Sequence, residues 1–551
     1  MANPQDPGSL TREPPAEAYL PRTRLPAWGV EDLPEPTPPR WRNWKAFIGP
    51  SIVMMGVQIG GGEWLFGPEI TAKYGGSLLW IATVAILLQV FYNLECGRYA
   101  LATGEPILTG FFRSRPGPFF WTLIFAFFSS AYLIPGLSTH AAAIVFAVVH
   151  DRPPGQGDKG WVMTAAYITL GLVVLPVLFG GKVYNTLQAV MTIKVFAVLG
   201  FCLLLGLFTV SAESWGQILT GFFQFGSVPV LTEAGGEKTV NAFAQLVREG
   251  TWPIVSLANI AVLGAFAGYA GGGGLSNSAY SSYARDKGWG MGAKVGAIPS
   301  AVGGKNIALS HLGKVFPLSD ENLRRWRGWW RVIIVDQVWI WMPGCFVGMA
   351  LPALLSLEFA PHSILYGQKS DWTQAIVTAE GLRRAPHFSP WLGQCLYLAM
   401  LGIGLLVLLP SQMSAVDDFS RRWTDAIWSA SARIRARLHG DQVKLIYYVL
   451  LATYVAWSLF ALWLFSTYGT PKLMTLIIAN LNNLILGVTA FFVLRINLRF
   501  LAPPLRPRWH HKLGMIACGT FYLGLSALVF YEKQLPILLQ LLSDLRQTLG
   551  V

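Results

Sequence analysis

Long apolar runs, many of 20 residues or more, recur along most of the chain and are separated by short clusters of charged residues. A run of this length crosses a hydrocarbon core of ~30 Å as a helix. In a bilayer, only helices and closed barrels satisfy every backbone polar group, and these runs are far too long for barrel strands. The pattern therefore predicts an all-α integral membrane protein.

About eleven membrane-spanning helices are expected, at residues 46–73, 77–101, 119–149, 161–180, 183–210, 252–283, 328–355, 391–416, 443–466, 473–498 and 513–532. Charged residues make up only 13% of the chain, about half of the fraction typical of soluble domains. We divide the chain into a polar, mostly disordered tail (1–45), a first five-helix repeat (46–210), an external loop (211–251), a second five-helix repeat (252–498), and an eleventh helix with a C-terminal tail (499–551).

Basic residues gather in the loops 285–327, 417–444 and 495–512. The positive-inside rule then places the N-terminus in the cytoplasm, in a cell inner or plasma membrane. Because the bases follow this topology, the net charge of +13 does not predict a nucleic-acid partner. The five cysteines lie in apolar segments without metal-type spacing, and no cofactor is expected. The expected partners are the lipid bilayer and a small-molecule or ion substrate, and the oligomeric state stays open.

Two glycine clusters lie at membrane depth, in the first and sixth predicted spans. They are Gly60, Gly61 and Gly62, followed by Glu63, and Gly271, Gly272, Gly273 and Gly274. Each glycine costs a helix ~1 kcal/mol relative to alanine, so contiguous runs favour an unwound segment. Unwound backbone is tolerated in a membrane only where it faces protein or a water-filled cavity. Two breaks five spans apart predict a LeuT-like 5+5 inverted repeat, with the site between broken helices 1 and 6.

Several short motifs resemble the Nramp divalent-metal transporter family. The pair Gly49-Pro50, the run from Tyr74 to Trp80 and Gly104 are similar to the first two helices of that family, and no gap is needed between Pro50 and Trp80. The segments 401–419 and 476–494 are similar at a weaker level. The resemblance implies a secondary-active transporter with the LeuT-like fold, not an enzyme.

The chain departs from the family at the positions that hold metal. The family's first-helix motif is Asp-Pro-Gly-Asn, and the matched residues here are the glycines at 60–62 and Glu63. The family's Met-Pro-His motif in helix 6 is replaced by glycines, and the stretch matching its acidic third helix offers only His140. We therefore identify the chain as a divergent member that lacks the usual metal-binding motifs.

Polar groups inside membrane spans are functional candidates by default. Glu63 is the leading candidate for a proton carrier, and His140 is the second; a helix-capping role for Glu63 stays equally open. Lys194 either pairs with an acid or meets an anionic substrate. Asn480 is a candidate for lining the pathway. At the predicted eighth span, Ser411 and Ser414 are candidates to supply hydroxyls to a sodium site of the LeuT type, and Asp417 and Asp418 are expected to be solvated at its cytoplasmic end.

Unwound glycines expose amide N–H groups, and helix N-termini add partial positive charge. We therefore expect a small organic anion, such as a carboxylate, or a zwitterion, with possible coupling to protons through Glu63. The alternative is a divalent cation, hydrated Mg²⁺ or Mn²⁺, with Glu63 as its carboxylate. A non-transporting membrane receptor is the third hypothesis. On the leading hypothesis the predicted substrate-binding residues are Gly60, Gly61, Gly62, Glu63, Gly271, Gly272, Gly273, Gly274 and Asn480.

Overall fold

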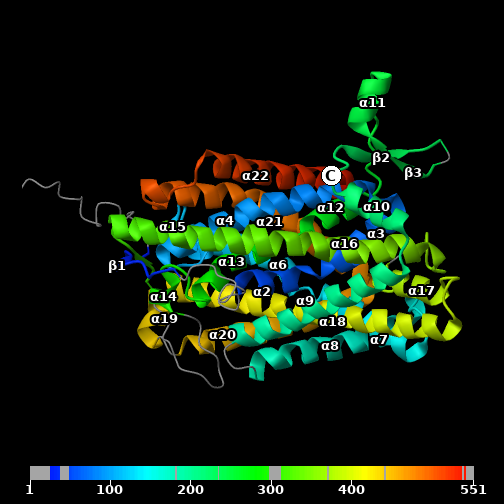
Figure 1. Cartoon of the computed structure of the whole chain (residues 1–551). Helices are drawn as coiled ribbons and strands as arrows, with labels where there is room; N and C mark the ends of the chain where they lie inside the picture. The colour runs from blue at the N-terminus through cyan, green and yellow to red at the C-terminus, as the bar shows by residue number, and fades with distance from the viewer. Residues whose placement is uncertain are drawn as a thin grey trace, which may run out of the picture.

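The helices of the bundle run side by side along one common direction (Figure 1). This computed structural model describes residues 25–36, 49–179, 183–233, 235–296, 312–368, 371–439, 442–536 and 539–540. The longest helices are α4 (Trp80–Thr103), α8 (Lys159–Phe179), α9 (Val183–Thr209), α16 (Met342–Phe359), α18 (Pro390–Ala430), α20 (Val443–Tyr468), α21 (Pro471–Phe500) and α22 (Trp509–Val529).

Within the described residues, eight helices are long and apolar enough to cross a membrane. Their outward faces are also apolar: on α9, Ile193, Phe196 and Leu207 are each exposed over more than half of their surface. Exposed apolar stripes of this kind are stable against lipid and would be costly in water. The chain is a multi-pass membrane protein, as predicted.

The first predicted span is interrupted. It consists of α2 (Pro50–Gln58), the π-helical segment η3 (Gly61–Phe66) and α3 (Gly67–Tyr74). The interruption itself lies at Ile59 and Gly60, so it begins earlier than the predicted Gly60–Gly62. A side chain at Gly62 would lie 2.8 Å from the backbone of Tyr269, so close packing against the sixth span requires glycine there.

The sixth predicted span is interrupted between α12 (Ile260–Tyr269) and α13 (Leu275–Asp286). All four glycines from Gly271 to Gly274 have positive φ, between 60° and 108°. Side chains other than glycine adopt this left-handed region only at a cost. The prediction of broken helices 1 and 6 is therefore confirmed, with the break in helix 6 where the glycine run was read.

A third interruption was not predicted. The expected helix over 119–149 consists of α6 (Pro118–Ser130), a short turn η5 (Ala131–Leu133) and α7 (Gly136–His150). Pro135 has no N–H and disfavours helix at the residue before it. Hydroxyl groups of α20 bind the carbonyls freed by this break: Tyr454 donates to Tyr132 O at 2.7 Å and Ser458 donates to Leu133 O at 2.9 Å.

Short elements cover the two ends of the bundle. One end carries α10 (Ala212–Gly221), the hairpin of β2 (Ser227–Leu231) and β3 (Glu237–Asn241), α11 (Ala242–Glu249) and α17 (Val377–Arg384); α11 projects away from the bundle in Figure 1. The other end holds α14 (Gly292–Val295), α15 (Asp320–Ile334), which leads through η7 (Val335–Trp341) into α16, α19 (Ala432–Arg437), and the parallel pair β1 (Gly29–Val30) and β4 (Lys314–Val315). The helix α5 (Ile107–Arg113) follows α4, and single turns complete the chain at Gly75–Leu78, Gln156–Asp158, Ala360–His362, Pro503–Leu505 and Phe530–Gln534.

Residues 25–36, which belong to the tail predicted to be mostly disordered, dock on the helical bundle. Leu33 is fully buried, and its amide donates to Oδ1 of Asn322 in α15 at 3.1 Å. The Trp329 indole donates to Pro34 O at 2.8 Å. The apolar residues between the prolines of this segment therefore dock on α15. Residues 1–24 and 37–48 lie outside the described residues.

Candidate functional site

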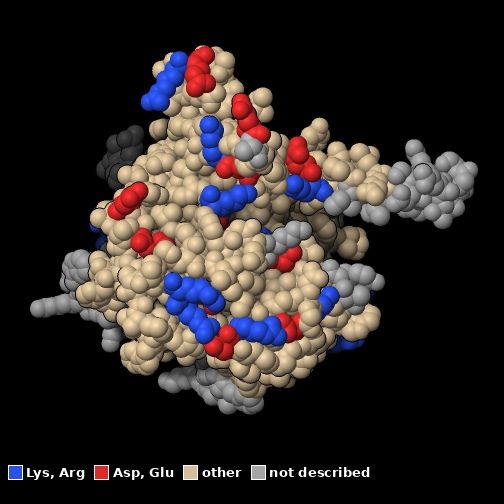
Figure 2. Space-filling view, turned by 90° about the vertical axis from the view of Figure 1, so that its right-hand side faces the viewer, with Lys and Arg blue, Asp and Glu red and all other residues tan. Residues whose placement is uncertain are grey.

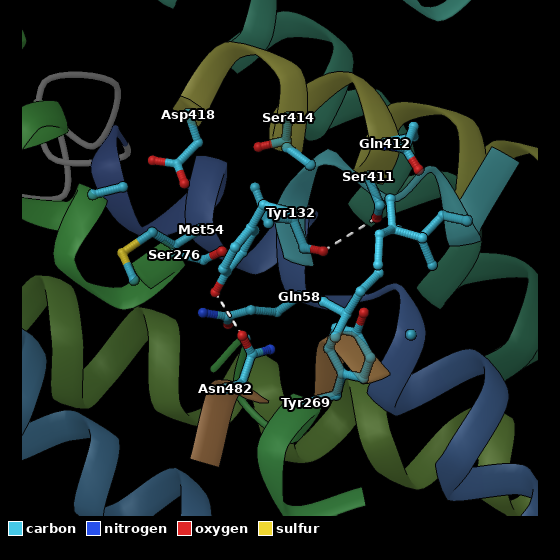
Figure 3. Close-up of a pocket in the computed structure, with 18 of the residues that line it drawn as sticks. Met54, Gln58, Tyr132, Tyr269, Ser276, Ser411, Gln412, Ser414, Asp418 and Asn482 are labelled. Carbon is cyan, nitrogen blue, oxygen red and sulfur yellow. Dashed lines mark hydrogen bonds between the residues drawn. The ribbon is translucent and has the colours of Figure 1, made fainter. Parts of the chain in front are cut away.

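A cavity lies where the three interrupted helices meet α18 and α21 (Figure 3). Its volume, counted as room for the centres of water molecules, is about 60 Å³. One water molecule needs roughly 10–15 Å³ on this measure, so the cavity holds a few waters or one small solute. The lining residues are Met54, Val57, Gln58, Gly61, Tyr132, Ile134, Leu137, Tyr269, Gly272, Ser276, Ala279, Tyr283, Ser411, Gln412, Ser414, Ala415, Asp418, Ile478 and Asn482.

Tyr132 connects three elements at the wall of the cavity. Its hydroxyl donates to Oδ1 of Asn482 in α21 at 2.6 Å and accepts from the amide of Leu275 at 2.8 Å (Figure 3). Leu275 is the first residue of α13, so the phenol satisfies one of the free amides at that helix start. The third break thereby positions a side chain that stabilises the break in helix 6.

Three of the four amides of the run from Gly271 to Gly274 are already hydrogen-bonded within the protein. The Gly271 amide donates to Oε1 of Glu63 at 3.3 Å, and the Gly273 amide donates to Oε1 of Gln89 at 3.3 Å. The Gly272 amide donates to Tyr269 O at 2.9 Å. Most of the amides that were expected to bind an anion are therefore already bound to groups of the protein itself.

Glu63 is fully buried, and it is absent from the cavity lining. Its second carboxyl oxygen, Oε2, has no hydrogen-bond partner among the described residues. The side chain lies toward α16, where a side chain added at Gly348 would be 3.9 Å from its Cγ. Among the glycines predicted to bind substrate, Gly61 and Gly272 line the cavity, whereas Gly60, Gly62, Gly271, Gly273 and Gly274 lie behind it.

The two polar candidates on α21 and α7 also lie away from the cavity. Asn480 donates to the carbonyls of Ala261 and Leu476, each at 3.0 Å, whereas Asn482 faces the cavity two residues later. His140 is fully buried, with Nε2 3.3 Å from the Thr475 hydroxyl and no partner on Nδ1 among the described residues. In a helix, residues two positions apart point in different directions, which explains why Asn480 and Asn482 have different surroundings.

The acidic residues at the end of the eighth span are buried rather than solvated. α18 continues to Ala430, beyond the predicted end at residue 416. Asp418 lines the cavity and forms an ion pair with Arg422 one turn later, and Asp417 is 3.2 Å from Arg421 in the same way. These arginines supply the counter-charges that let both carboxylates leave water. Arg421 and Arg422, near the start of the basic loop 417–444, are therefore buried inside the protein.

Ion pairs lie on both sides of the cavity, toward the two ends of the bundle. On one side, Arg421 pairs with Asp286 of α13, and Arg285 of α13 contacts Asp425 of α18 at 2.6 Å. At the end that carries α11, basic and acidic side chains lie next to one another (Figure 2). The pairs on that side are Lys73 with Glu237, Arg152 with Asp158, Arg383 with Asp151, Arg384 with Glu380 and Lys472 with Glu69.

Comparisons with known proteins agree with this architecture. The divalent metal cation transporter MntH of Chromohalobacter salexigens is 31% identical over 84 residues, which is 15% of this chain and 19% of that relative. A manganese transporter of Eremococcus coleocola, solved with an aromatic bis-isothiourea compound, has a TM-score of 0.56 and 14% identity, over 93% of this chain and 94% of its own. A point variant of that transporter has a TM-score of 0.56 and 13% identity, over 94% of each chain.

The chain has the fold of the Nramp transporters. The resemblance inferred from the first two helices is thus confirmed, and the low identity agrees with a divergent Nramp-like chain. No protein-family model matches the sequence. The relative and the structural neighbours named above are transporters, not enzymes. The LeuT-like arrangement with broken helices 1 and 6 is the one predicted from the glycine runs.

Tyr132 and Gln58 are among the residues of the site that were not predicted from the sequence. Tyr132 belongs to an apolar run that looks like continuous helix, and Pro135 is the signal that marks its break. Gln58 lines the cavity at the end of α2, and its Oε1 accepts from the Cys345 thiol at 3.0 Å. Glutamine just before a glycine cluster at membrane depth is the sequence feature that indicates this position.

Proposed function

We propose that this chain is a secondary-active transporter that moves a small zwitterionic organic solute through the cavity, with proton coupling. The observation that carries the proposal is the chemistry of the lining. Most lining side chains are apolar or neutral and polar, and the one charged member, Asp418, is paired with Arg422. Mostly apolar cavities with a few oriented polar groups are typical of sites for small organic molecules.

A zwitterion fits the polar groups of the lining. The Asp418 carboxylate and the Ser414 hydroxyl lie on the same side of the cavity (Figure 3), where they would contact the ammonium group of the solute. The amide nitrogen of Gln58 faces a carboxylate, since its oxygen is already bound to Cys345. A solute of net charge zero needs no further counter-charge in a site where the protein has already paired its own charges. A simple anion has less support, because the amides of Gly271, Gly272 and Gly273 are already bound within the protein.

A divalent cation is the second candidate, and two observations favour it. The curated relative is named a divalent metal cation transporter, and the structural neighbour is named a manganese transporter. The Asp418 carboxylate and the neutral oxygens of Ser411 and Asn482 line the same cavity. No group of three His, Cys, Asp or Glu side chains gathers among the described residues, so such an ion would keep most of its water.

We further propose that Glu63 carries the coupled proton. It is a buried carboxyl group with one unpaired oxygen and no basic group within 4.0 Å in the described chain. Protonation removes a charge that is costly at membrane depth. Glu63 also contacts the break in helix 6 through Gly271, so a change in its charge acts on both interrupted helices. His140 is the next candidate if substitution of Glu63 leaves proton-driven uptake unchanged.

The orientation follows from the basic end of the bundle. We propose that the end holding α14, α15 and α19 is cytoplasmic, because these helices belong to the basic loops named above and positive loops stay inside. The N-terminal segment 25–36, which docks on α15, would then be cytoplasmic.

The substrate is tested by thermal unfolding of the purified protein with glycine and L-alanine as zwitterions, acetate as an anion, and MgCl₂ and MnCl₂. A true ligand at a hundred times its dissociation constant stabilises the protein by about 2.7 kcal/mol. We expect stabilisation by a zwitterion that Ala415→Phe, in the cavity wall, abolishes. Ala452→Phe on the exposed face of α20 is the control and keeps the effect.

Uptake into proteoliposomes under an imposed pH gradient then separates the candidates. Accumulation of the stabilising zwitterion supports the proposal. Stabilisation and uptake with Mg²⁺ or Mn²⁺ alone would favour the cation transporter. Binding without uptake of any probe would favour the receptor.

A further inference from the structure

The short helix α11 carries an exposed apolar stripe. Phe243, Leu246 and Val247 occupy positions i, i+3 and i+4, which share one face of a helix. Their side chains are exposed over 56%, 43% and 86% of their surface. Gln245 and Arg248 lie on the opposite face of the same helix. The helix is therefore amphipathic, and its apolar face is not covered by the described part of the chain.

The chain that follows α11 extends this apolar surface. Trp252 is 54% exposed and Ile254 is 90% exposed. The Trp252 ring packs edge-on against Phe243, with ring centroids 5.8 Å apart, so the two segments form one surface. We call Phe243, Leu246, Val247, Trp252 and Ile254 the α11 patch. Exposed apolar patches of this kind mark contacts with a membrane or a protein, and tryptophan is enriched where a membrane meets water.

The direction of α11 is fixed by hydrogen bonds at its start. Asn241 caps the helix: its Oδ1 accepts from the Ala244 amide at 3.0 Å, and its side-chain nitrogen donates to Phe225 O at 2.9 Å. The Ala242 amide donates to Gly226 O at 2.9 Å. From this anchor α11 runs across the common direction of the bundle helices (Figure 1). Because membrane spans run along the membrane normal, a helix that crosses them at the end of the bundle runs along the membrane surface.

The polar face of α11 is turned away from the bundle. Figure 2 views the end of the molecule that carries α11, and basic and acidic side chains lie on the visible face at the tip of this projection. The charged residues of α11 are Arg248 and Glu249. The stripe on the other face is thus turned toward the level of the membrane. On the same side of the bundle, the lipid-facing surface of α22 continues to the exposed Leu528 and Phe530, so the patch extends a surface that already faces lipid.

We propose that the α11 patch docks on the lipid bilayer, in the leaflet at this end of the bundle. Amphipathic helices with aromatic and aliphatic side chains on one face bury that face ~5–10 Å deep, at the boundary between headgroups and acyl chains. The hairpin that carries α11 also binds α3, since Glu237 accepts from Lys73 at 2.7 Å and from Tyr74 at 2.6 Å. One hairpin therefore connects the docked helix to half of the broken first span.

This inference goes beyond the proposed function, because it concerns the bilayer as a partner and uses no residue of the cavity. The test places a fluorescent nitrobenzoxadiazole label at Val247→Cys, in a Cys395→Ser background that removes the exposed native cysteine. The labelled protein is reconstituted in phosphatidylcholine nanodiscs that hold one molecule each. Quenching by lipid spin-labelled near the headgroup is compared with quenching by aqueous iodide. Arg248→Cys, on the charged face, is the matched control, and Leu246→Cys repeats the measurement on the stripe.

The labels at Val247 and Leu246 should be quenched strongly by the spin-labelled lipid, and several-fold less by iodide than the label at Arg248. Equal iodide quenching at Val247 and Arg248 would overturn the proposal, because the stripe would then face water when one copy sits alone in lipid. Protection of Val247 from both quenchers would overturn it as well, because protein would then cover the stripe. Neither result bears on the proposed solute, since no solute is present.

Discussion

The carboxyl group of Glu63 accepts a hydrogen bond of 3.3 Å from the amide of Gly271, which joins the break in the first span to the break in the sixth. The two residues are 208 positions apart in the sequence. The side chain of Glu63, next to the break in the first span, therefore satisfies a free amide in the break of the sixth span. The pair therefore couples the two discontinuous helices on which the proposed transport depends.

Glu63→Gln should keep solute binding and lose proton-driven accumulation. The amide oxygen of glutamine can still accept from Gly271, so the contact between the breaks survives while the titratable group is removed. Exchange of labelled for unlabelled solute should continue at a rate close to that of wild type. Proteoliposome uptake with and without a pH gradient measures both, and Glu321→Gln on exposed α15 is the control. Undiminished accumulation by Glu63→Gln would shift attention to His140.

Gly273→Ala should destabilise the protein and abolish binding. Gly273 has φ of +76°, and an added Cβ would overlap the carbonyl of Gly268. The left-handed conformation alone costs an alanine about 1–2 kcal/mol. Gly171→Ala in α8, where a Cβ meets only open space, should leave the unfolding temperature unchanged or slightly raise it. Equal behaviour of the two variants in detergent would contradict the assigned break.

Tyr132→Phe should weaken solute binding without adding atoms to the cavity. The change removes the phenol hydroxyl that binds the Leu275 amide and the side-chain oxygen Oδ1 of Asn482, and both groups are buried. An unsatisfied buried group costs about 1–3 kcal/mol, so the unfolding temperature should fall and the solute should bind more weakly. Calorimetry and thermal unfolding check the two effects. Tyr531→Phe, which removes an exposed hydroxyl, should change neither.

Mn²⁺ should bind weakly, with no micromolar site. The metal motifs of the Nramp family are replaced here by glycines and Glu63, and the Asp418 carboxylate already pairs with Arg422. Transition metals favour sites that combine several nitrogen, sulfur or carboxylate ligands. Titration calorimetry with MnCl₂ measures the affinity directly. Micromolar binding that disappears in Glu63→Ala would show that a metal site exists after all.

The contact between α3 and the β2–β3 hairpin should become weaker as the pH falls into the acid range. Burial raises the pKa of Glu237, but hydrogen bonds from Lys73, Ser256 and Tyr74 outweigh it and lower the pKa to about 2. Because the folded pKa lies below the ordinary value of 4.5, the stabilisation is complete above that pH and is lost as pH falls toward 2. The difference in unfolding temperature between wild type and Glu237→Gln should therefore shrink below pH 4.5. A difference that is constant from pH 7 to 3 would exclude this origin.

The glycine runs were sufficient to predict the two main breaks. Contiguous glycines oppose a helix whatever surrounds them, so Gly60 and Gly271–Gly274 carry the signal in the sequence itself. The break before Pro135 was missed because the flanking residues are apolar and one proline can also kink a helix without ending it. Its stabilising groups, Tyr454 and Ser458, come from α20, more than 300 residues away.

Local apolar length and glycine content were enough to predict a multi-pass helical protein with broken first and sixth spans, and short motifs such as Gly49-Pro50 were enough to show the likeness to Nramp. They could not show which polar groups meet in the folded chain. In the folded protein the amides of Gly271 and Gly273 donate to Glu63 and Gln89. Asp418 pairs with Arg422, and Lys194 donates to Ser411. A buried polar group must find its partner inside the protein, and the packing of distant helices decides which partner is within reach.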